Sequence, residues 1–137
     1  MNILVLDRDG GVYIASPIAT YRQIHRYPRY VQRVRASYPD RTIIEPRGRW
    51  LTTAQWLTEW HALLPTLAAV AFFCDRDGTI GAGVFQEIAD ARRAGLPIFG
   101  LTNDVVPQLR TRFALRSFDG ADARRFARVA FLPDGSD

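Results

Sequence analysis

Three carboxylate residues gather around a glycine-rich stretch in the middle of the chain. Asp75 and Asp77 follow an apolar run, residues 69–74, that predicts a buried strand, and Glu87 lies a few residues later. At 3.6 residues per turn, residues 84–95 form a helix whose apolar stripe includes Glu87. A glutamate is rarely buried without a partner. Its position therefore indicates either an edge side chain that bends toward solvent or a carboxylate aimed into a cleft at the carboxyl end of the strand.

The elements that must position these carboxylates alternate as in an α/β domain. We expect strands at residues 11–15, 42–46, 69–74, 97–101 and 129–132, and helices at 28–38, 52–64, 84–95, 105–113 and 120–127. The helix at 52–64 opens with a capping box formed by Thr52 and Gln55. The polar side of the helix at 84–95 is expected to carry Gln86, Asp90 and Arg93. These elements predict a doubly wound, mainly parallel five-stranded sheet, and a hairpin through Asp7–Gly11 would add residues 3–6 as an N-terminal edge strand.

Length and composition predict one domain, residues 1–137, with a core of ordinary size. No apolar run approaches the roughly 20 residues that span a bilayer, and the early Asp7 argues against a secretion signal. Cys74 is the single cysteine, which excludes a disulfide framework and a cysteine zinc site. We therefore expect a cytoplasmic protein without membrane partners.

All 18 basic residues are arginines, and the formal net charge is +4. The absence of lysine excludes every mechanism that needs one. The charge keeps open an arginine-mediated nucleic-acid binder, whose affinity would fall steeply with salt, but a uniform arginine bias is more typical of genome composition, so nucleic acid is not the expected partner.

The sequence Asp-Arg-Asp-Gly occurs twice, at residues 7–10 and 75–78. An apolar strand followed by Asp-x-Asp-Gly resembles the haloacid dehalogenase phosphatases, in which the first aspartate attacks phosphorus. That family also needs a downstream lysine or equivalent cation and an acidic pair for magnesium. The chain has no lysine and no such acidic pair, which argues against a phosphatase, and the first copy is interpreted as a solvated turn.

A second resemblance extends from about residue 11 to residue 101. The chain is similar to the nucleoside 2-deoxyribosyltransferase family and its relatives that hydrolyse nucleotide N-glycosidic bonds. The matching motifs, in order, are Val12-Tyr13-Ile14-Ala15-Ser16-Pro17, Ile43-Ile44-Glu45-Pro46, Phe72-Phe73-Cys74-Asp75, Asp77-Gly78-Thr79, Glu87-Ile88-Ala89-Asp90-Ala91 and Gly95-Leu96-Pro97-Ile98. Each motif is weak alone, and their order and spacing together carry the resemblance. It implies a flavodoxin-like fold and a homodimer or larger homo-oligomer.

The resemblance implies a retaining displacement at the anomeric carbon of a nucleoside or nucleoside 5′-monophosphate. Glu87 would be the nucleophile, and Asp77 or Asp75 would protonate or hydrogen-bond the leaving base, a role that benefits from a raised pKa. This chemistry needs neither a metal nor an organic cofactor. The residues expected to bind substrate lie after the first strand, in the glycine loop and after a later strand: Ser16, Pro17, Thr20, Arg22, Gly78, Thr79, Gly81, Gly83 and Asn103.

One departure from the family concerns the loop before the nucleophile. In many members the glutamate follows the Asp-Gly step by only a few residues, whereas residues 78–86 intervene here. The longer loop either widens the pocket or moves Glu87 out of register with Asp77.

The main alternative function is a nucleotide-binding or sensing module of the same fold without turnover. Several residues also have structural interpretations. Asp104 suits the N-cap of the helix at 105–113, Trp56 and Trp60 at helical spacing are interpreted as core, and Trp50 in its arginine-rich loop is a candidate for stacking on a base.

Overall fold

The computed structural model describes residues 4–17, 26–45, 52–118 and 124–133. Within these residues, a five-stranded sheet has the order β2-β1-β3-β5-β6. Neighbouring strands among the first four are parallel, and β6 is antiparallel to β5. The strands are β1 (Gly11–Ala15), β2 (Ile43–Ile44), β3 (Leu67–Phe73), β5 (Ile98–Leu101) and β6 (Leu109–Arg110). The expected mixed α/β domain with a mostly parallel sheet is confirmed.

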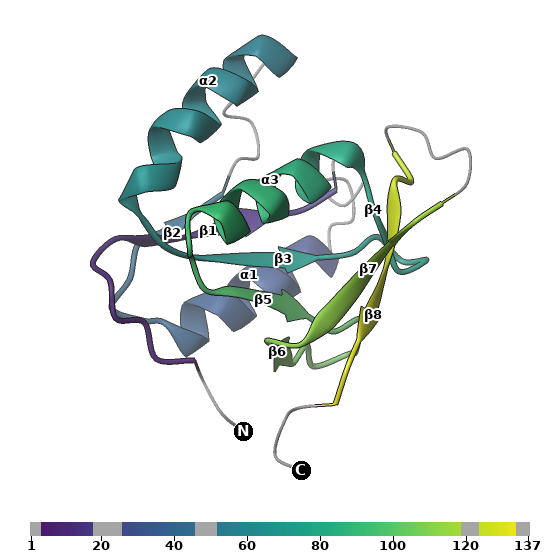
Figure 1. Cartoon of the computed structure of the whole chain (residues 1–137). Helices are drawn as coiled ribbons and strands as arrows, with labels where there is room; N and C mark the ends of the chain where they lie inside the picture. Colours follow the sequence, from purple (N-terminus) through teal and green to yellow (C-terminus); the bar gives the residue numbers. More distant parts are fainter. Residues whose placement is uncertain (1–3, 18–25, 46–51, 119–123, 134–137) are drawn as a thin grey trace.

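Helices cover both faces of this sheet (Figure 1). Helix α1 (Arg26–Ser37) packs on one face, and α2 (Thr53–Leu63) and α3 (Ala82–Arg93) pack on the other. A 3-10 turn, η2 (Leu64–Thr66), joins α2 to β3. The strand side chains alternate between the two layers, so that Val12 and Ile14 meet α1 while Tyr13 and Ala15 meet α2 and α3. Because β1 and β3 are buried on both faces, they read as continuous apolar runs.

The end of the described chain forms a second, antiparallel sheet instead of helices. This sheet has the order β4-β8-β7, with β4 (Thr79–Ile80), β7 (Phe113–Ser117) and β8 (Ala127–Phe131). The helix expected at 105–113 is wrong because residues 109–110 and 113 belong to strands. The helix expected at 120–127 is wrong in its described part, since residues 124–126 are not helical and Ala127 begins β8. The expected strand at 129–132 overlaps β8, but it pairs in this second sheet.

The second sheet packs on the same face as α3, against β3 and β5. The ring of Phe72 lies 4.7 Å from that of Phe113 and 6.3 Å from that of Phe131, measured between centroids. Gly100 makes this contact possible, because a Cβ atom there would lie 2.4 Å from the Phe131 ring. Strands β7 and β8 therefore cover part of one face of the five-stranded sheet, and helices cover other parts of it.

In its described part, the N-terminal segment is not the expected edge strand. Residues 4–10 form neither helix nor strand. Their carbonyl groups are taken by side chains from beyond α1, since Tyr38 donates to Leu4 at 2.8 Å and Arg41 donates to Leu6 at 3.0 Å. Gly10, at φ 123°, then turns the chain into β1. These side-chain hydrogen bonds replace the backbone pairing that a hairpin would need.

Of the two residues expected to be helix N-caps, Thr52 caps a helix and Asp104 does not. Thr52 is the N-cap of α2, and its hydroxyl accepts a hydrogen bond from the Gln55 amide at 3.1 Å, which confirms the capping prediction. Asp104 caps no helix, because the chain continues into β6; its carboxylate instead accepts a hydrogen bond from the Thr102 hydroxyl at 2.6 Å.

Candidate functional site

The side chain of Glu87 lies between α3, β1 and α2 and is 4 % exposed. Its Oε2 atom accepts hydrogen bonds from the Tyr13 hydroxyl and from the Trp56 indole Nε1, the latter at 3.1 Å. Within the described residues, no hydrogen bond ends on the other oxygen, Oε1. The expectation that Glu87 falls inside the buried stripe of the helix is confirmed, and both neutral donors hold the same carboxylate oxygen.

The connections of the chain place this carboxylate near the carboxyl ends of the parallel strands. Helix α3 follows β3 and β4, so it begins at that edge, and Glu87 lies roughly 7 Å along the helix axis from Ala82 at 1.5 Å per residue. Helix α2 follows β2 in the same way, and Trp56 lies in its first turn. Open α/β sheets bind ligands at this edge.

Burial raises the pKa of Glu87 from its ordinary value of 4.5 to about 7, because the charged carboxylate loses its contact with water. The hydrogen bonds from Tyr13 and Trp56 oppose this rise, since they stabilise the ionised form, and the negative charge of Asp90 adds to it. Near neutral pH the side chain is therefore divided between acid and carboxylate. A carboxyl group poised in this way is typical of functional sites.

Asp90, one turn further along α3, is a second buried carboxylate at 6 % exposure. Its expected place on the polar side of the helix is wrong, because α2 covers α3 in addition to the sheet and widens the buried arc. The carboxylate accepts hydrogen bonds from the Trp60 indole N–H and from the side-chain amide of Gln86, both at 2.9 Å, and it forms an ion pair with Arg93. His61 Nε2 lies 4.0 Å away. Among the residues that the structure describes, Asp90 thus has a cationic partner and Glu87 has none.

The carboxylate of Asp77 is held by Thr79 of its own turn and by Arg125, which precedes β8. Its carboxylate accepts hydrogen bonds from the Thr79 amide at 3.1 Å and hydroxyl at 2.5 Å, and it forms an ion pair with Arg125 at 3.0 Å. Burial alone would raise its pKa, but the Thr79 hydrogen bonds and the Arg125 charge outweigh it and lower the pKa. The expected raised pKa is therefore wrong for Asp77, which is suited to stay ionised rather than to donate a proton.

Asp75 closes the same turn with its backbone. Its amide donates to Thr79 at 2.8 Å, its carbonyl accepts from Gly78 at 2.9 Å, and its carboxylate accepts from the Arg76 amide at 2.8 Å. Gly78 completes the turn at φ 80°, a conformation that favours glycine. In the described part of the chain, Glu87 forms no hydrogen bond or ion pair with either aspartate of this loop. The carboxylate that acts on Glu87 is Asp90 on its own helix.

Asn103, at the end of β5, belongs to a polar cluster on the α1 side of the sheet. Its Oδ1 accepts hydrogen bonds from Arg26 at 2.9 and 3.3 Å and from the Tyr30 hydroxyl at 3.0 Å, and its Nδ2 donates to the Arg76 carbonyl at 3.2 Å. Arg26 is 5 % exposed, and its guanidinium carbon lies 5.0 Å from the centre of the Tyr30 ring. The neighbouring Cys74 is buried, and this burial raises the pKa of its thiol to about 12, so the thiol is not an activated nucleophile.

The other expected substrate contacts are only partly placed. Ser16 is 6 % exposed, its Oγ atom has no hydrogen-bond partner among the described residues, and Pro17 beside it is buried. Gly81 is the N-cap of α3 in extended conformation, and Gly83 is exposed in the first turn of the helix. Thr20, Arg22 and Trp50 lie outside the described residues.

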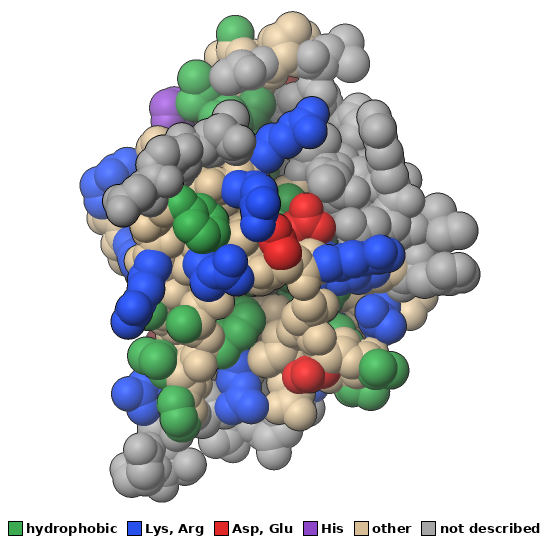
Figure 2. Space-filling view, turned by 90° about the vertical axis from the view of Figure 1, so that its right-hand side faces the viewer, with side chains coloured by type: hydrophobic (Ala, Val, Ile, Leu, Met, Phe, Trp, Pro, Cys, Tyr) green, Lys and Arg blue, Asp and Glu red, His purple; other side chains and the backbone are tan. Residues whose placement is uncertain are grey.

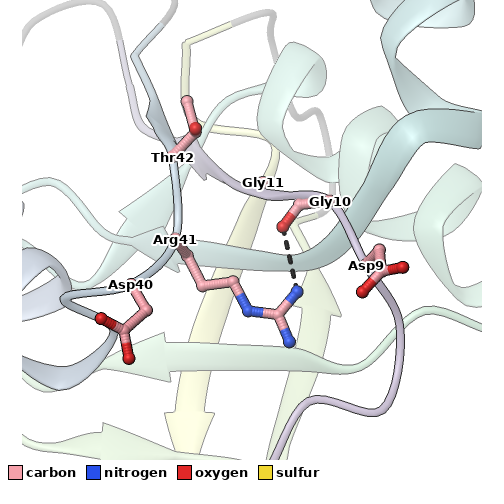
Figure 3. A pocket seen from close by; sticks show the side chains of 6 residues that line it. All are labelled: Asp9, Gly10, Gly11, Asp40, Arg41 and Thr42. Atoms are coloured by element: carbon pink, nitrogen blue, oxygen red, sulfur yellow. Dashed lines mark hydrogen bonds between the residues drawn. The ribbon is translucent and has the colours of Figure 1, made fainter.

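The surface offers two further observations. On the face shown in Figure 2, basic side chains surround a small acidic patch and are interrupted by apolar groups, so they form no continuous basic surface there. An open hollow of about 450 Å³ lies at the amino ends of β1 and β2, between Gly11 and Thr42 (Figure 3). Its arginine, Arg41, donates to the carbonyl of Gly10 at 3.1 Å and fastens the N-terminal segment. This hollow is at the opposite edge from Glu87.

Sequence reasoning missed the residues that surround Glu87. In the sequence, Tyr13 stands out only as part of a motif, and the spacing of Trp56 from Trp60 indicates a core residue. The polar atom of each ring was the available signal, because a buried Tyr hydroxyl or Trp N–H usually finds a partner. The partner was the carboxylate already identified.

Within the described residues, no group of three His, Cys, Asp or Glu side chains could hold a metal ion. None of the described helices combines the length and apolar character needed to cross a bilayer. Comparison of the chain with protein-family models, curated proteins and solved structures finds no match. The case for a function therefore depends on the residues themselves.

Proposed function

We propose that this chain cleaves or transfers at the N-glycosidic bond of a nucleoside or nucleoside 5′-monophosphate through a glycosyl ester on Glu87. The observation that carries the proposal is the state of its carboxylate: buried, with Oε2 held by Tyr13 and Trp56 and with Oε1 bonded to none of the described residues. This asymmetry suits a nucleophile, because one oxygen is held while the other can attack.

The topology supports the same proposal. Counted along the chain, the parallel strands β2, β1, β3 and β5 have the spatial order 2-1-3-4, which is the order in which flavodoxin-like doubly wound folds begin. We infer that this domain is a variant of that fold whose last unit is replaced by β6 and the second sheet. Such folds bind ligands at the carboxyl ends of their strands, where Glu87 and Trp56 lie.

In the first step, Oε1 of ionised Glu87 attacks C1′ of the sugar as the bond from C1′ to the base nitrogen breaks. The electron pair of that bond leaves with the base, which takes up a proton, and the sugar becomes an ester of Glu87. The pKa of about 7 means that the reactive carboxylate is present at neutral pH. Its burial leaves it poorly solvated, so less water must be displaced before it attacks.

In the second step, water or a nitrogen of another base attacks C1′ and gives up a proton to the group that supplied one in the first step or to solvent, and the bond from C1′ to Oε1 breaks. Oε2 then gathers negative charge as the carboxylate re-forms, and the Tyr13 and Trp56 donors stabilise that charge. Water gives hydrolysis, and a second base gives transfer. The proton for the leaving base would come from Asp75 or from solvent, because the lowered pKa of Asp77 suits it to be an anion that stabilises positive charge on the sugar.

A nucleotide-binding module without turnover is the second candidate. The observation that favours it is the same Asp77, which hydrogen bonds and Arg125 hold as an anion where the reaction was expected to use an acid. A pure binder would retain its ligand affinity when Glu87 is changed, and it would release no base.

The test is base release from a panel of purine and pyrimidine nucleosides and their 5′-monophosphates, followed by liquid chromatography. We expect release by the wild-type protein, a loss of at least about a thousandfold in Glu87→Gln, and full activity in the exposed control Glu59→Gln. Adding a second free base distinguishes transfer from hydrolysis. If no substrate releases its base, or if the Glu87→Gln variant is as active as the wild type, the proposed reaction is ruled out. If the protein binds a nucleoside or nucleotide without releasing its base, the binding module is established. Light scattering of the same samples tests the expected homo-oligomer.

A further inference from the structure

Helix α2 reaches the buried core of the protein through two tryptophans. Trp60 is fully buried and Trp56 is half-buried, whereas Ala54, Gln55, Leu57, Thr58, Glu59, His61 and Ala62 are exposed. Trp56 and Trp60 are four residues apart, so they lie on one face of the helix.

Each tryptophan donates its indole N–H to a buried carboxylate on α3. Trp56 Nε1 lies 3.1 Å from Glu87 Oε2, and Trp60 Nε1 lies 2.9 Å from Asp90 Oδ2. Tyr13, on the strand below, joins the two pairs, because its ring centroid lies 4.8 Å from that of Trp60 and its hydroxyl donates to Glu87. The register of α2 against α3 is therefore fixed by two parallel indole–carboxylate contacts.

The two carboxylates differ in what else surrounds them. Asp90 is paired with Arg93 and hydrogen-bonded by Gln86, so removal of the Trp60 donor would leave its charge compensated. The two described residues that donate to Glu87 are neutral, and both act on Oε2. Loss of one donor would therefore affect Glu87 more than Asp90, since hydrogen bonds to charged groups are among the stronger ones.

We propose that Trp56 is a positioning residue for Glu87, whose indole N–H holds Oε2 together with Tyr13 so that Oε1 faces the sugar. This inference rests on the proposed function for the role of Oε1, but the contact itself is independent of turnover. It assigns to α2 a task beyond covering the sheet: the helix delivers a donor to the reacting group.

The consequence is a defined change in ionisation. Among the described residues, the groups that face Glu87 are Tyr13 from β1 and Trp56 from α2, together with the Asp90 charge from its own helix. His61 and Arg93 pair with Asp90. Because the Trp56 hydrogen bond lowers the pKa of Glu87, Trp56→Phe should raise it, whereas Trp60→Phe leaves these contacts in place.

The chain is well suited to a direct measurement because it contains three glutamates, Glu45, Glu59 and Glu87. Glutamate labelled with ¹³C at the side-chain carboxyl gives one NMR signal for each, and Glu87→Gln identifies the third. We expect the Glu87 signal to titrate about one pH unit higher in Trp56→Phe than in the wild type. When release of the nucleobase is measured against pH, the midpoint of its loss at acidic pH should rise by the same amount, and activity should recover at higher pH. The Trp60→Phe control should keep the wild-type midpoint for both.

A second measurement needs no substitution at α2. The indole N–H signal of Trp56 in the wild-type protein should shift with the midpoint of the Glu87 carboxyl signal. An unchanged Glu87 midpoint in folded Trp56→Phe, an equal shift in Trp60→Phe, or a Trp56 indole signal that ignores the titration would each refute the inference. If no substrate releases base, the proposed function fails, while the two titrations still decide whether Trp56 holds the carboxylate.

Discussion

Replacement of Glu87 by glutamine should make the stability of the protein less dependent on pH. The pKa of Glu87 is raised by burial to about 7 in the folded chain, and its ordinary value is 4.5. Between these values the folded protein retains a proton that the unfolded chain releases. The free energy of unfolding therefore falls as pH rises through this window and levels off above it.

The size of this effect follows from the two pKa values. At 1.36 kcal/mol for each pH unit of difference, the interval from 4.5 to about 7 corresponds to roughly 3 kcal/mol. Glutamine carries no charge at any pH and can still accept the hydrogen bonds from Tyr13 and Trp56. Relative to the wild type, Glu87→Gln should gain about 3 kcal/mol between about pH 4.5 and about pH 8, or roughly 10 °C in melting temperature.

Thermal unfolding followed by circular dichroism at several pH values in this range measures the difference directly. The comparison cancels the titration of every other group, because both proteins share them. The control is Glu59→Gln, which removes an exposed carboxylate of α2 and should leave the difference from the wild type nearly constant. A melting-temperature gap between Glu87→Gln and the wild type that stays the same from about pH 4.5 to about pH 8 would refute the assignment of a raised pKa.

Two further substitutions test the fold around the site. Gly100→Ala should cost about 1–3 kcal/mol of stability, because its Cβ would lie 2.4 Å from Phe131 and 2.7 Å from Phe72. Gly83→Ala should be neutral or stabilising, because its Cβ would have no atom within 4 Å apart from its own helix backbone and chain neighbours. Equal denaturation midpoints for the two variants would contradict the packing of the second sheet. Asp77→Asn should destabilise the protein at neutral pH, and this effect should shrink as the pH falls below the ordinary aspartate pKa of 3.8, because a lowered pKa contributes stability that is lost as the carboxylate protonates. Urea denaturation at a series of pH values from neutral downwards checks this, and a pH-independent effect would be inconsistent with it.

The parallel part of the fold could be predicted because its signals are local and consistent. The strands β1, β3 and β5 are short apolar runs bounded by turn residues, and Thr52 with Gln55 marks the start of α2. The position of Glu87 followed from helical periodicity alone. Each of these features depends on residues close in the chain, so one sequence was enough to find it.

The second sheet could not be predicted because its evidence is spread over distant residues. The alternation of Ala127, Val129 and Phe131 along β8 is typical of a strand, and a strand was expected at 129–132, but the alternation does not say which sheet the strand joins. The contact that places it is with Gly100, whose missing side chain admits Phe131. A glycine inside a strand often marks such a close approach, but it does not reveal which segment approaches.

The candidate site shows the same division between local and distant information. The sequence indicated which carboxylate is buried, but it paired Glu87 with Asp75 and Asp77, its neighbours in the motif. The structure instead gives it Tyr13 and Trp56, which come from two other elements. Periodicity determines the face of a helix on which a side chain lies; the identity of its partners depends on how three elements pack together.

The contrast between the two buried carboxylates of α3 is the strongest structural argument for a role of Glu87 in chemistry. A buried carboxylate kept only for structure is least costly when a cation compensates it, as Arg93 does for Asp90. Within the described parts of the chain, Glu87 is held by neutral donors on one oxygen, and burial raises its pKa to about 7, which weakens the folded state at neutral pH. An ion pair at that position would lower the pKa, but it would also make the carboxylate a poorer nucleophile. The arrangement therefore sacrifices stability to keep a reactive carboxylate, which is the compromise expected of a group that must form and break a bond with its substrate.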